Sequence, residues 1–474
     1  MDFHIGLTGR GNLSAQIYRQ VLAAILDGRL RNGERLPATR SLASRLNVAR
    51  NTVAEAYERL VAEGVAAGHA GAGTFVTAAI PRENLVRSAF SGNVKPRKLW
   101  RSIAVPPRLS TPVEYDFSLG FPDPALFPHS EWRRLMGQEL RSFSLQHHIP
   151  VNPGGRLRAA IARHIAVSRA ARAQAKDVII TQGAQQAFDL IGRVLIGTGT
   201  RVAVEDPGYP NARLLFQSLG GRVMGVPVDE EGLDVGAIPA RVRIVYVTPS
   251  HQFPLGHVMS LRRRTELLAW AEHRNAVIIE DDYDSEFRFC GRPVDPLQSL
   301  DRAGRVVYVG SFSKVLAPSL RRGFLIAPAS LQPALVAAKQ LTDLTSEAIT
   351  MGTLARFIDE GLLARHIRIV SREYEMRYKQ IASSLERYLS RYLQLVPAAA
   401  GLHVAATAVG RMTKDIAKTV RIAENHGVRV HSLADFYTGR RTQAGVVFGF
   451  GRISPPQIDA GIQRLAASFA AALA

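Results

Sequence analysis

Lys314 is the residue whose neighbours point most directly to a chemical role. Ser311 and Ser313 precede it at the end of the apolar run 306–309, and Arg321 follows seven residues later. Hydroxyls and an arginine can bind a phosphate, and a lysine amine can add to an aldehyde. These residues therefore predict a lysine that holds a phosphorylated aldehyde as a Schiff base, and pyridoxal 5'-phosphate is a cofactor of that kind.

A second phosphate-binding feature lies earlier in the chain. Gly183, Ala184 and Gln185 follow the apolar run 178–180, and a helix is predicted to begin at these residues. The N–H groups at a helix start carry partial positive charge, and glycine allows a ligand to approach closely. We expect these three residues to cradle the phosphate.

Two further turns carry groups that suit an aromatic cofactor ring. Tyr209 lies in a Pro-Gly turn, where its ring either stacks on the cofactor or has a purely structural role. Asp281 and Tyr283 follow the apolar run 276–279. A carboxylate that faces a pyridine nitrogen keeps it protonated, and a phenol can hydrogen-bond the ring hydroxyl. We assign these two roles to Asp281 and Tyr283.

Short apolar runs that alternate with helical stretches are predicted to position these residues. The runs are 178–180, 202–204, 244–247, 276–279 and 306–309. Continuous apolar strands are typical of an α/β fold with a mostly parallel sheet that is covered on both faces, and ligands bind at the carboxyl ends of such strands. We expect one domain over 113–474, with a large lobe over about 150–350 and a smaller α/β lobe over about 351–474.

The first 78 residues have the pattern of an α+β winged helix-turn-helix. Helices are predicted over 13–28, within 36–46 and up to residue 63, and 65–76 reads as two short strands around a glycine-rich turn. The predicted inward residues are Leu42 and Leu46 on the second helix and Val53, Tyr57, Leu60 and Val61 on the third. Many small three-helix domains share this spacing without binding nucleic acid, but the wing favours DNA binding.

Composition agrees with a multidomain protein that has a polyanionic partner. The 474 residues are 46% hydrophobic and 21% charged, and the formal net charge is +20. A basic surface favours nucleic acid because its contacts with phosphate release counterions, although a merely solvated basic surface is the alternative. Residues 79–112 are predicted to be a basic linker, which either attracts phosphate or serves as a solvated tether.

Cysteine usage and hydropathy bear on the compartment. Cys290 is the single cysteine, so no internal disulfide can form. The chain shows neither a secretory leader nor an uninterrupted apolar stretch of about 18 residues. We expect a cytoplasmic protein without a membrane segment, and no metal site is predicted.

The motifs together resemble the MocR/GabR group of the GntR family of bacterial regulators, and the resemblance covers nearly the whole chain. In the head it rests on 25–40, Ala49-Arg-Asn-Thr-Val53 and Gly73-Thr-Phe-Val76. In the remainder it rests on Glu205-Asp-Pro-Gly-Tyr-Pro210, Pro249-Ser-His-Gln-Phe-Pro-Leu-Gly256, Ile279-Glu-Asp-Asp-Tyr283 and 310–321.

The resemblance implies a winged helix-turn-helix joined to a fold-type I, aspartate aminotransferase-like domain. It implies that Arg40, Arg50, Asn51 and Thr52 contact double-stranded promoter DNA, and that Lys314 forms the Schiff base with pyridoxal 5'-phosphate. It also implies a head-to-tail homodimer, which would match two DNA half-sites.

Several positions depart from the aminotransferase pattern. The asparagine of Asn-Pro-Thr-Gly is missing from Phe253-Pro-Leu-Gly256, and His251 or Gln252 is the candidate substitute. The strand 445–450 lacks the arginine that grips a substrate carboxylate, which leaves Arg440, Arg441 or Arg452. No tyrosine precedes the Asn152-Pro-Gly-Gly155 turn, although His148 lies nearby.

Two functions fit this sequence. The first is a transcription regulator that uses the cofactor, or an amino compound condensed with it, as its effector. The second is an aminotransferase with an appended DNA-binding head. The departures favour the regulator, because turnover requires an oriented second substrate.

Overall fold

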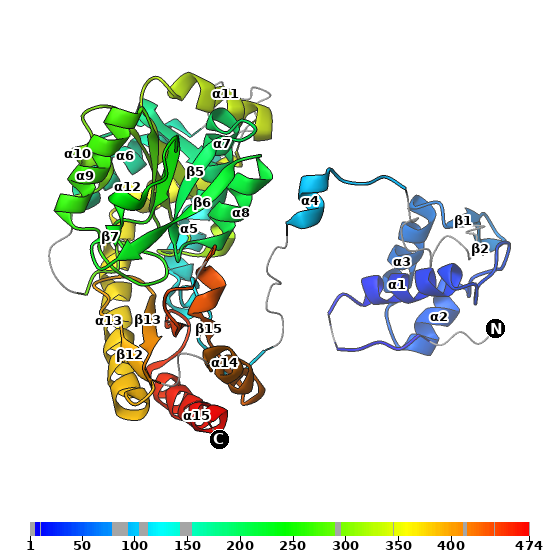
Figure 1. Cartoon of the computed structure of the whole chain (residues 1–474). Coiled ribbons are helices and arrows are strands. Elements are labelled where there is room, and N and C mark those ends of the chain that lie inside the picture. The colour runs from blue at the N-terminus through cyan, green and yellow to red at the C-terminus, as the bar shows by residue number, and fades with distance from the viewer. Residues whose placement is uncertain are drawn as a thin grey trace. The chain divides into compact units, whose positions relative to one another are not determined.

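A computed structural model of the protein describes residues 5–9, 11–77, 93–103, 112–142, 154–289, 295–344, 346–410, 415–439 and 441–473 (Figure 1). His148, Asn152, Cys290 and Arg440 lie outside these ranges, as does much of the predicted linker 79–112. The chain divides into two compact units, Met1–Pro96 and Arg97–Ala474, so the predicted linker is shared between them.

Three helices and a hairpin form the first unit. The helices are α1 (Leu13–Leu26), α2 (Thr39–Leu46) and α3 (Arg50–Ala62). Val53, Tyr57 and Leu60 of α3 are buried as predicted, whereas the prediction for Val61 is wrong, because its side chain is 40% exposed. Val61 lies about 100° around the helix axis from the buried Leu60, so its side chain turns away from the core. The small Ala56 is buried on the core side of α3.

The wing is an antiparallel hairpin of β1 (Ala66–His69) and β2 (Gly73–Val76). Its second strand is tied to the segment before α2, because the N–H of Leu36 donates to the carbonyl of Thr74 at 2.8 Å. Leu42 of α2 is buried and Leu46 is partly buried against the same core. The predicted winged helix-turn-helix is therefore confirmed.

Part of the predicted linker is helical. A short helix, α4 (Lys98–Ser102), lies where the sequence showed no helical period. Its five residues are too few to show the apolar repeat from which a helix is recognised.

An eight-stranded sheet forms the centre of the second unit, in the order β4-β11-β10-β9-β8-β5-β6-β7. The strands are β4 (Val178–Thr181), β5 (Arg201–Asp206), β6 (Arg222–Asp229), β7 (Gly232–Leu233), β8 (Ile244–Val247), β9 (Val277–Asp282), β10 (Val306–Ser311) and β11 (Gly323–Ile326). All five predicted runs are strands of this sheet, and β11 and β7 pair antiparallel with their neighbours. The predicted mostly parallel sheet is confirmed.

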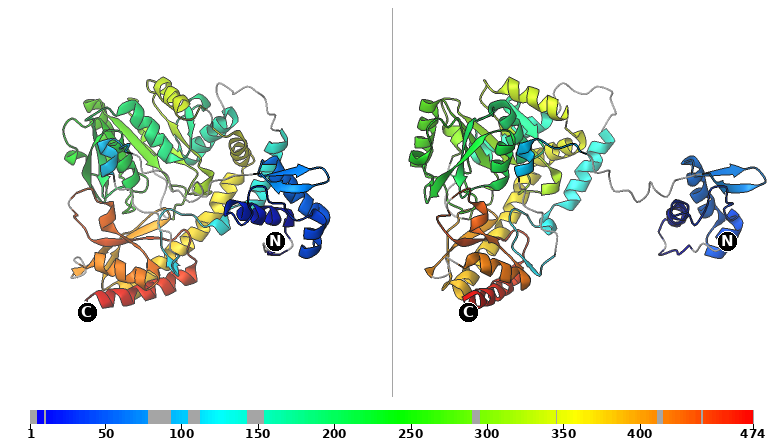
Figure 2. Two further views of the ribbon diagram at one scale, coloured as in Figure 1. Left: turned by 90° about the vertical axis from the view of Figure 1, so that its right-hand side faces the viewer. Right: turned by 45° about the vertical axis from the view of Figure 1, so that its right-hand side comes forward.

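Helices cover both faces of this sheet (Figure 2). One face packs on α7 (Ala184–Leu195), α8 (Pro210–Ser218) and α11 (Gln332–Asp343). The other face packs on α6 (Gly155–Arg169), α9 (Leu261–Arg274) and α10 (Leu297–Leu300). Burial on both faces explains why these strands are continuously apolar in the sequence.

One helix near the expected boundary between the lobes packs on the large lobe. α12 (Ala348–Asp359) packs on α6 and on α5 (His129–Ser142), so it belongs to the large lobe although it extends past residue 351. Met351 of α12 is buried in the same apolar cluster as Ile180 of the large sheet.

The small lobe contains a second sheet, in the order β12-β13-β16-β15. Its strands are β12 (Leu393–Leu395), β13 (His403–Ala408), β15 (His431–Ser432) and β16 (Gly445–Gly449), and its helices are α13 (Leu362–Leu389), α14 (Ile416–Asn425) and α15 (Pro455–Leu473). β3 (Tyr115–Asp116) pairs parallel with β14 (Val428–Arg429), and the N–H of Tyr115 donates to the carbonyl of Gly427 at 2.9 Å. The beginning of the second unit is thereby attached to the small lobe.

Among the described helices, none combines the length and the apolar character that a bilayer crossing requires.

Candidate functional site

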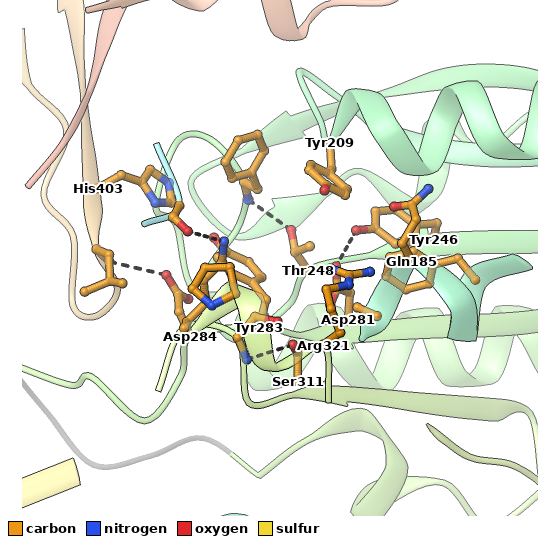
Figure 3. A pocket seen from close by; sticks show the side chains of 18 residues that line it. Gln185, Tyr209, Tyr246, Thr248, Asp281, Tyr283, Asp284, Ser311, Arg321 and His403 are labelled. Carbon is orange, nitrogen blue, oxygen red and sulfur yellow. Dashed lines mark hydrogen bonds between the residues drawn. The ribbon is translucent and has the colours of Figure 1, made fainter. Parts of the chain in front are cut away.

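A pocket of about 180 Å³ lies at the carboxyl ends of the strands of the large sheet (Figure 3). Of the predicted cofactor residues, the following line it: Ala184, Gln185, Tyr209, Asp281, Tyr283, Ser311, Ser313, Lys314 and Arg321. Gly183 directly precedes the helix that contributes Ala184. The structure thus brings together residues that are separated by more than a hundred positions in the sequence.

Lys314 follows β10, and its half-buried side chain lines this pocket. Its Nζ donates a hydrogen bond to the carbonyl of Gly120 at 2.6 Å. Burial lowers the pKa of Lys314, while the negative charges of Asp284 and Asp281 act in the opposite direction. Gly120 has φ +77°, and a Cβ there would lie 2.6 Å from Nζ, so a larger residue would displace the amine from this position. A lysine whose amine loses its proton easily is suited to attack a carbonyl.

Asp281 has one satisfied and one free carboxylate oxygen. Oδ2 accepts a hydrogen bond from the hydroxyl of Tyr246 at 2.6 Å, whereas Oδ1 has no partner among the described residues. Burial raises the pKa of Asp281 to about 7, although the bond from Tyr246 and the charge of Lys314 oppose this shift. A buried acceptor without a partner is costly, so a ring N–H that enters this pocket would satisfy it.

The alternation along β9 explains why Asp281, and not Glu280, faces the pocket. Successive side chains of a strand point to opposite faces. Glu280 accepts hydrogen bonds from the N–H groups of Leu297 and Gln298, both at 2.9 Å, at the start of α10. Its carboxylate is therefore used on the other face of the sheet.

The anion-binding end of the pocket combines a helix start with an arginine. Gly183 is the N-cap of α7 at φ 78°, so the free N–H groups of the first turn open at the pocket. A Cβ at this glycine would lie 3.3 Å from the guanidinium of Arg321, which itself donates to the carbonyl of Gln182 at 2.8 Å. Ser311 Oγ accepts from the N–H of Ser313 at 3.2 Å. This set of donors suits a phosphate group.

Aromatic rings form another wall of the pocket. The ring of Tyr209, at the N-cap of α8, packs edge to face on that of Phe253, with 5.6 Å between their centroids. The hydroxyl of Tyr209 accepts from Nδ2 of Asn211 at 3.2 Å. The packing with Phe253 is a structural role, and the ring also lines the pocket.

Tyr283 lines the pocket, but its hydroxyl also has a partner in the protein. It donates to the carbonyl of His251 at 2.9 Å. The two candidate substitutes for the missing asparagine are buried outside the pocket lining. Nδ1 of His251 lies 2.9 Å from Asp284, and Nε2 of Gln252 donates to the carbonyl of Pro207 at 2.9 Å. Nε2 of His251 has no partner among the described residues, and the suggested substitution stays a prediction.

Sequence reasoning missed several lining residues, including Tyr246, Thr248, Asp284 and His403. Tyr246 and Thr248 lie at the end of the predicted strand 244–247, so the rule that found Asp281 would also have found them. His403 comes from the small lobe, and no local pattern places it near Lys314.

Two of the three candidate arginines for a substrate carboxylate, Arg441 and Arg452, lie outside the described lining of this pocket. Arg441 lines a separate cavity beside β13. The guanidinium of Arg452 lies 5.3 Å from the centroid of the Phe121 ring. Arg440 lies outside the described residues.

In the first unit, the predicted DNA-binding residues lie on two helices. Arg40 is exposed on the first turn of α2, and Arg50, Asn51 and Thr52 begin α3. Arg50 and Asn51 are exposed, and Thr52 is half-buried.

Comparison with known proteins agrees with this division of the chain. Residues 13–76 match the family described as bacterial regulatory proteins, gntR family, and 135–468 match aminotransferase class I and II. A probable rhizopine catabolism regulatory protein, MocR, of Rhizobium meliloti is 35% identical, over 96% of this chain and 93% of the relative. The chain belongs to the MocR type of GntR-family regulators.

Other relatives and solved structures support the same assignment. The pyridoxine biosynthesis transcriptional regulator PdxR of Corynebacterium glutamicum is 33% identical, over 93% of this chain and 92% of the relative. A Pyrococcus horikoshii kynurenine aminotransferase structure has a TM-score of 0.71 and 28% identity, and covers 77% of this chain and 92% of that one. This GntR-family chain is thus a transcriptional regulator that binds DNA through its helix-turn-helix and carries an aminotransferase-like domain.

Proposed function

We propose that this regulator captures pyridoxal 5'-phosphate in the pocket around Lys314, and that the cofactor, or an amino compound condensed with it, changes the affinity for promoter DNA. The observation that carries the proposal is the unpartnered Oδ1 of Asp281, which lies in the same buried pocket as Lys314 and Arg321. A free acceptor, an amine and an anion site match the ring nitrogen, the aldehyde and the phosphate of this cofactor.

Each group of residues has a defined task in this proposal. The start of α7, Ser311, Ser313 and Arg321 bind the phosphate, and Asp281 holds the proton of the ring nitrogen. Tyr209 would cover the ring, and Tyr283, which also lines the pocket, would hydrogen-bond the ring hydroxyl. When bound, the cofactor supplies an aldehyde that condenses with amines and a ring that withdraws electrons.

DNA recognition is assigned to the exposed start of α3 and to Arg40. The first turn of a recognition helix is the part that enters the major groove in helix-turn-helix proteins. An effector can alter this binding only if it has different affinities for two arrangements of the protein, since equal affinity shifts no population. We propose a head-to-tail homodimer, whose two heads match two half-sites.

A gel-shift assay with the protein's own upstream DNA tests the proposal. The full chain is compared without cofactor, with cofactor, and with cofactor plus a panel of amines at fixed salt. Specific binding that cofactor or an amine changes is expected. If the protein shows no specific DNA binding at moderate salt, the proposal is contradicted. If neither the cofactor nor any amine changes the affinity for DNA, regulation by this pocket is contradicted.

A second function, amino-group transfer, is favoured by the completeness of the cofactor pocket. Steady-state assays with amino acids and 2-oxo acids measure it directly. We expect at most slow turnover, because the described pocket lining contains no arginine beyond Arg321, which lies at the anion end. Sustained turnover at ordinary enzyme rates would identify an aminotransferase with a DNA-binding head.

A further inference from the structure

Three arginines on one face of α13 have no acidic partner. Arg365, Arg368 and Arg372 are exposed, and together with Ile369 they line a hollow of the surface. Residues three and four positions apart are neighbours on a helix, so the three guanidinium groups share one face, which we call the arginine face. The charge of Arg365 acts on Glu131 of α5, but none of the three side chains forms an ion pair with a described residue.

The later part of α13 uses the same spacing for ion pairs. The helix runs from the large lobe along the small lobe (Figure 1). Arg377 Nε lies 2.9 Å from Glu373 Oε1, and Lys379 Nζ lies 2.6 Å from Glu375 Oε1. On the arginine face like charges occupy these positions, and like charges at this spacing destabilise a helix. The arrangement therefore weakens the isolated protein and favours an anionic partner.

The acidic residues on the neighbouring helices already have cations. Asp359 of α12 lies 2.6 Å from Arg163 of α6, and Glu360 lies 2.7 Å from Arg134 of α5. Arg368 also lines a second hollow, together with Arg163, so the basic surface continues towards α6. The carboxylates of this region thus leave the arginine face without a partner.

The length and the lining of the arginine face fit a nucleic-acid backbone. Seven residues of helix span about 10 Å, and a DNA duplex carries one negative charge per about 1.7 Å of its axis. Successive phosphates can therefore meet the three guanidinium groups. Apart from the arginines, the described lining of the hollow is one isoleucine, so no further polar side chain is present to recognise a compact ligand. The chain is a DNA-binding regulator with a net charge of +20, which favours DNA as the partner.

We propose that the arginine face is a second DNA-contacting surface, which binds phosphates of the promoter duplex in addition to the contacts made by the helix-turn-helix. Phosphate contacts raise affinity but carry no sequence information, so this surface adds strength and the helix-turn-helix supplies the sequence preference. The inference goes beyond the proposed function and does not depend on the cofactor pocket.

The salt dependence of DNA affinity tests this surface. The full chain and its triple variant Arg365→Gln, Arg368→Gln, Arg372→Gln are titrated without cofactor into labelled upstream DNA, and fluorescence anisotropy gives the affinity at each salt concentration. Each phosphate contact adds about 0.9 to the slope of log affinity against log salt, so the triple variant should have a slope shallower by about 2.7. Between about 50 and about 200 mM salt, the unchanged protein should then lose about 40-fold more affinity than the variant.

Two matched variants separate local contacts from net charge and from folding. Arginine to lysine at the same three positions keeps the charges and should keep the slope. Arg222→Gln, Arg243→Gln and Arg274→Gln together remove the same net charge from exposed positions elsewhere in the second unit and should leave the slope nearly unchanged. Glutamine and arginine have similar helix propensities, so α13 should remain folded, which circular dichroism and urea unfolding check.

An unrelated duplex gives an independent reading. Phosphates are the same in every sequence, so the glutamine variant of the arginine face should bind upstream and unrelated DNA more weakly by the same factor. A loss confined to the upstream DNA would overturn the inference.

The other outcomes are also decisive. An unchanged slope in the glutamine variant of the arginine face overturns the inference, as does an equal change in the control variant, which would assign the effect to net charge. If the slope is unchanged but light scattering shows an altered oligomeric state, the face is instead a contact between two copies of the chain. A changed slope together with DNA affinity that neither cofactor nor amines alter contradicts the proposed function alone.

Discussion

The hydroxyl of Tyr246 donates to Oδ2 of Asp281 at 2.6 Å, and this bond joins two neighbouring strands beneath the cofactor pocket. It stabilises the ionised form of a carboxyl group whose pKa burial raises to about 7. Tyr246→Phe should raise that pKa further and weaken cofactor uptake by about 1.5–3 kcal/mol, the range for hydrogen bonds to charged groups. Fluorescence or absorbance titration with pyridoxal 5'-phosphate at neutral pH measures the change, and an unaltered affinity would contradict it.

The free oxygen of Asp281 gives a second prediction. Asp281→Asn keeps the shape of the side chain but removes the charge that holds a ring proton, so we expect cofactor that dissociates readily and a shifted visible band. Asp189→Asn, on α7 outside the pocket lining, where the carboxylate pairs with Arg193 and is 20% exposed, is the matched control and should keep normal cofactor binding. Retention of tight cofactor binding by the Asp281 variant would remove this carboxylate from the proposed site.

Gly120 offers a test in which backbone strain can be separated from a steric clash. Gly120→Ala places a Cβ 2.6 Å from Lys314 Nζ at φ +77°, whereas Gly199→Ala places one in open space at φ +83°. Both changes should destabilise the fold by about 1–2 kcal/mol because of the left-handed backbone. Only Gly120→Ala should also abolish the visible band, and equal spectra for the two variants would be inconsistent with this geometry.

The pH dependence of cofactor capture follows from the burial of Lys314. Only the uncharged amine attacks the aldehyde, and burial lowers the pKa of Lys314 from its ordinary value of 10.5. The capture rate should therefore rise with pH and level off below that value. Stopped-flow absorbance from about pH 6 to about pH 10 measures it against a free lysine derivative. A capture rate that keeps rising with pH in parallel with that of the free lysine derivative would contradict a lowered pKa of Lys314.

The ion pair of Arg169 and Asp282 predicts a large stability effect outside the pocket. Arg169 Nε lies 2.7 Å from Asp282 Oδ2, and the two side chains are 5% and 3% exposed. Arg169→Met leaves a buried carboxylate without its cation and should cost about 3–5 kcal/mol in urea unfolding. The double change with Asp282→Leu should recover much of this loss. If the double variant is no more stable than Arg169→Met alone, the loss of the ion pair does not explain the lower stability.

Much of this architecture could be predicted from the sequence because local patterns carry it. The five apolar runs became strands, and Lys314, Asp281 and Arg321 meet in one pocket because the carboxyl ends of neighbouring strands meet at one edge of the sheet. Tyr246 was not predicted as a pocket residue, because it lies within the apolar run 244–247, which was interpreted only as a buried strand.

Other features depend on tertiary contacts that no local pattern encodes. His403 reaches the pocket from a different lobe, and α12 is held to the large lobe by contacts with α5 and α6. Val61 shows the same limit at a smaller scale, because an apolar residue at helical spacing lies at the edge of the buried stripe and remains 40% exposed.

The pairing of β3 with β14 has a consequence for the path between the two units. Gly120, which accepts the hydrogen bond of Lys314, comes four residues after Asp116, the last residue of β3. One short length of backbone thus holds both the partner of the reactive amine and the first strand that follows the DNA-binding head. A ligand that displaces the Lys314 amine from the carbonyl of Gly120 therefore acts on the same backbone segment that carries β3.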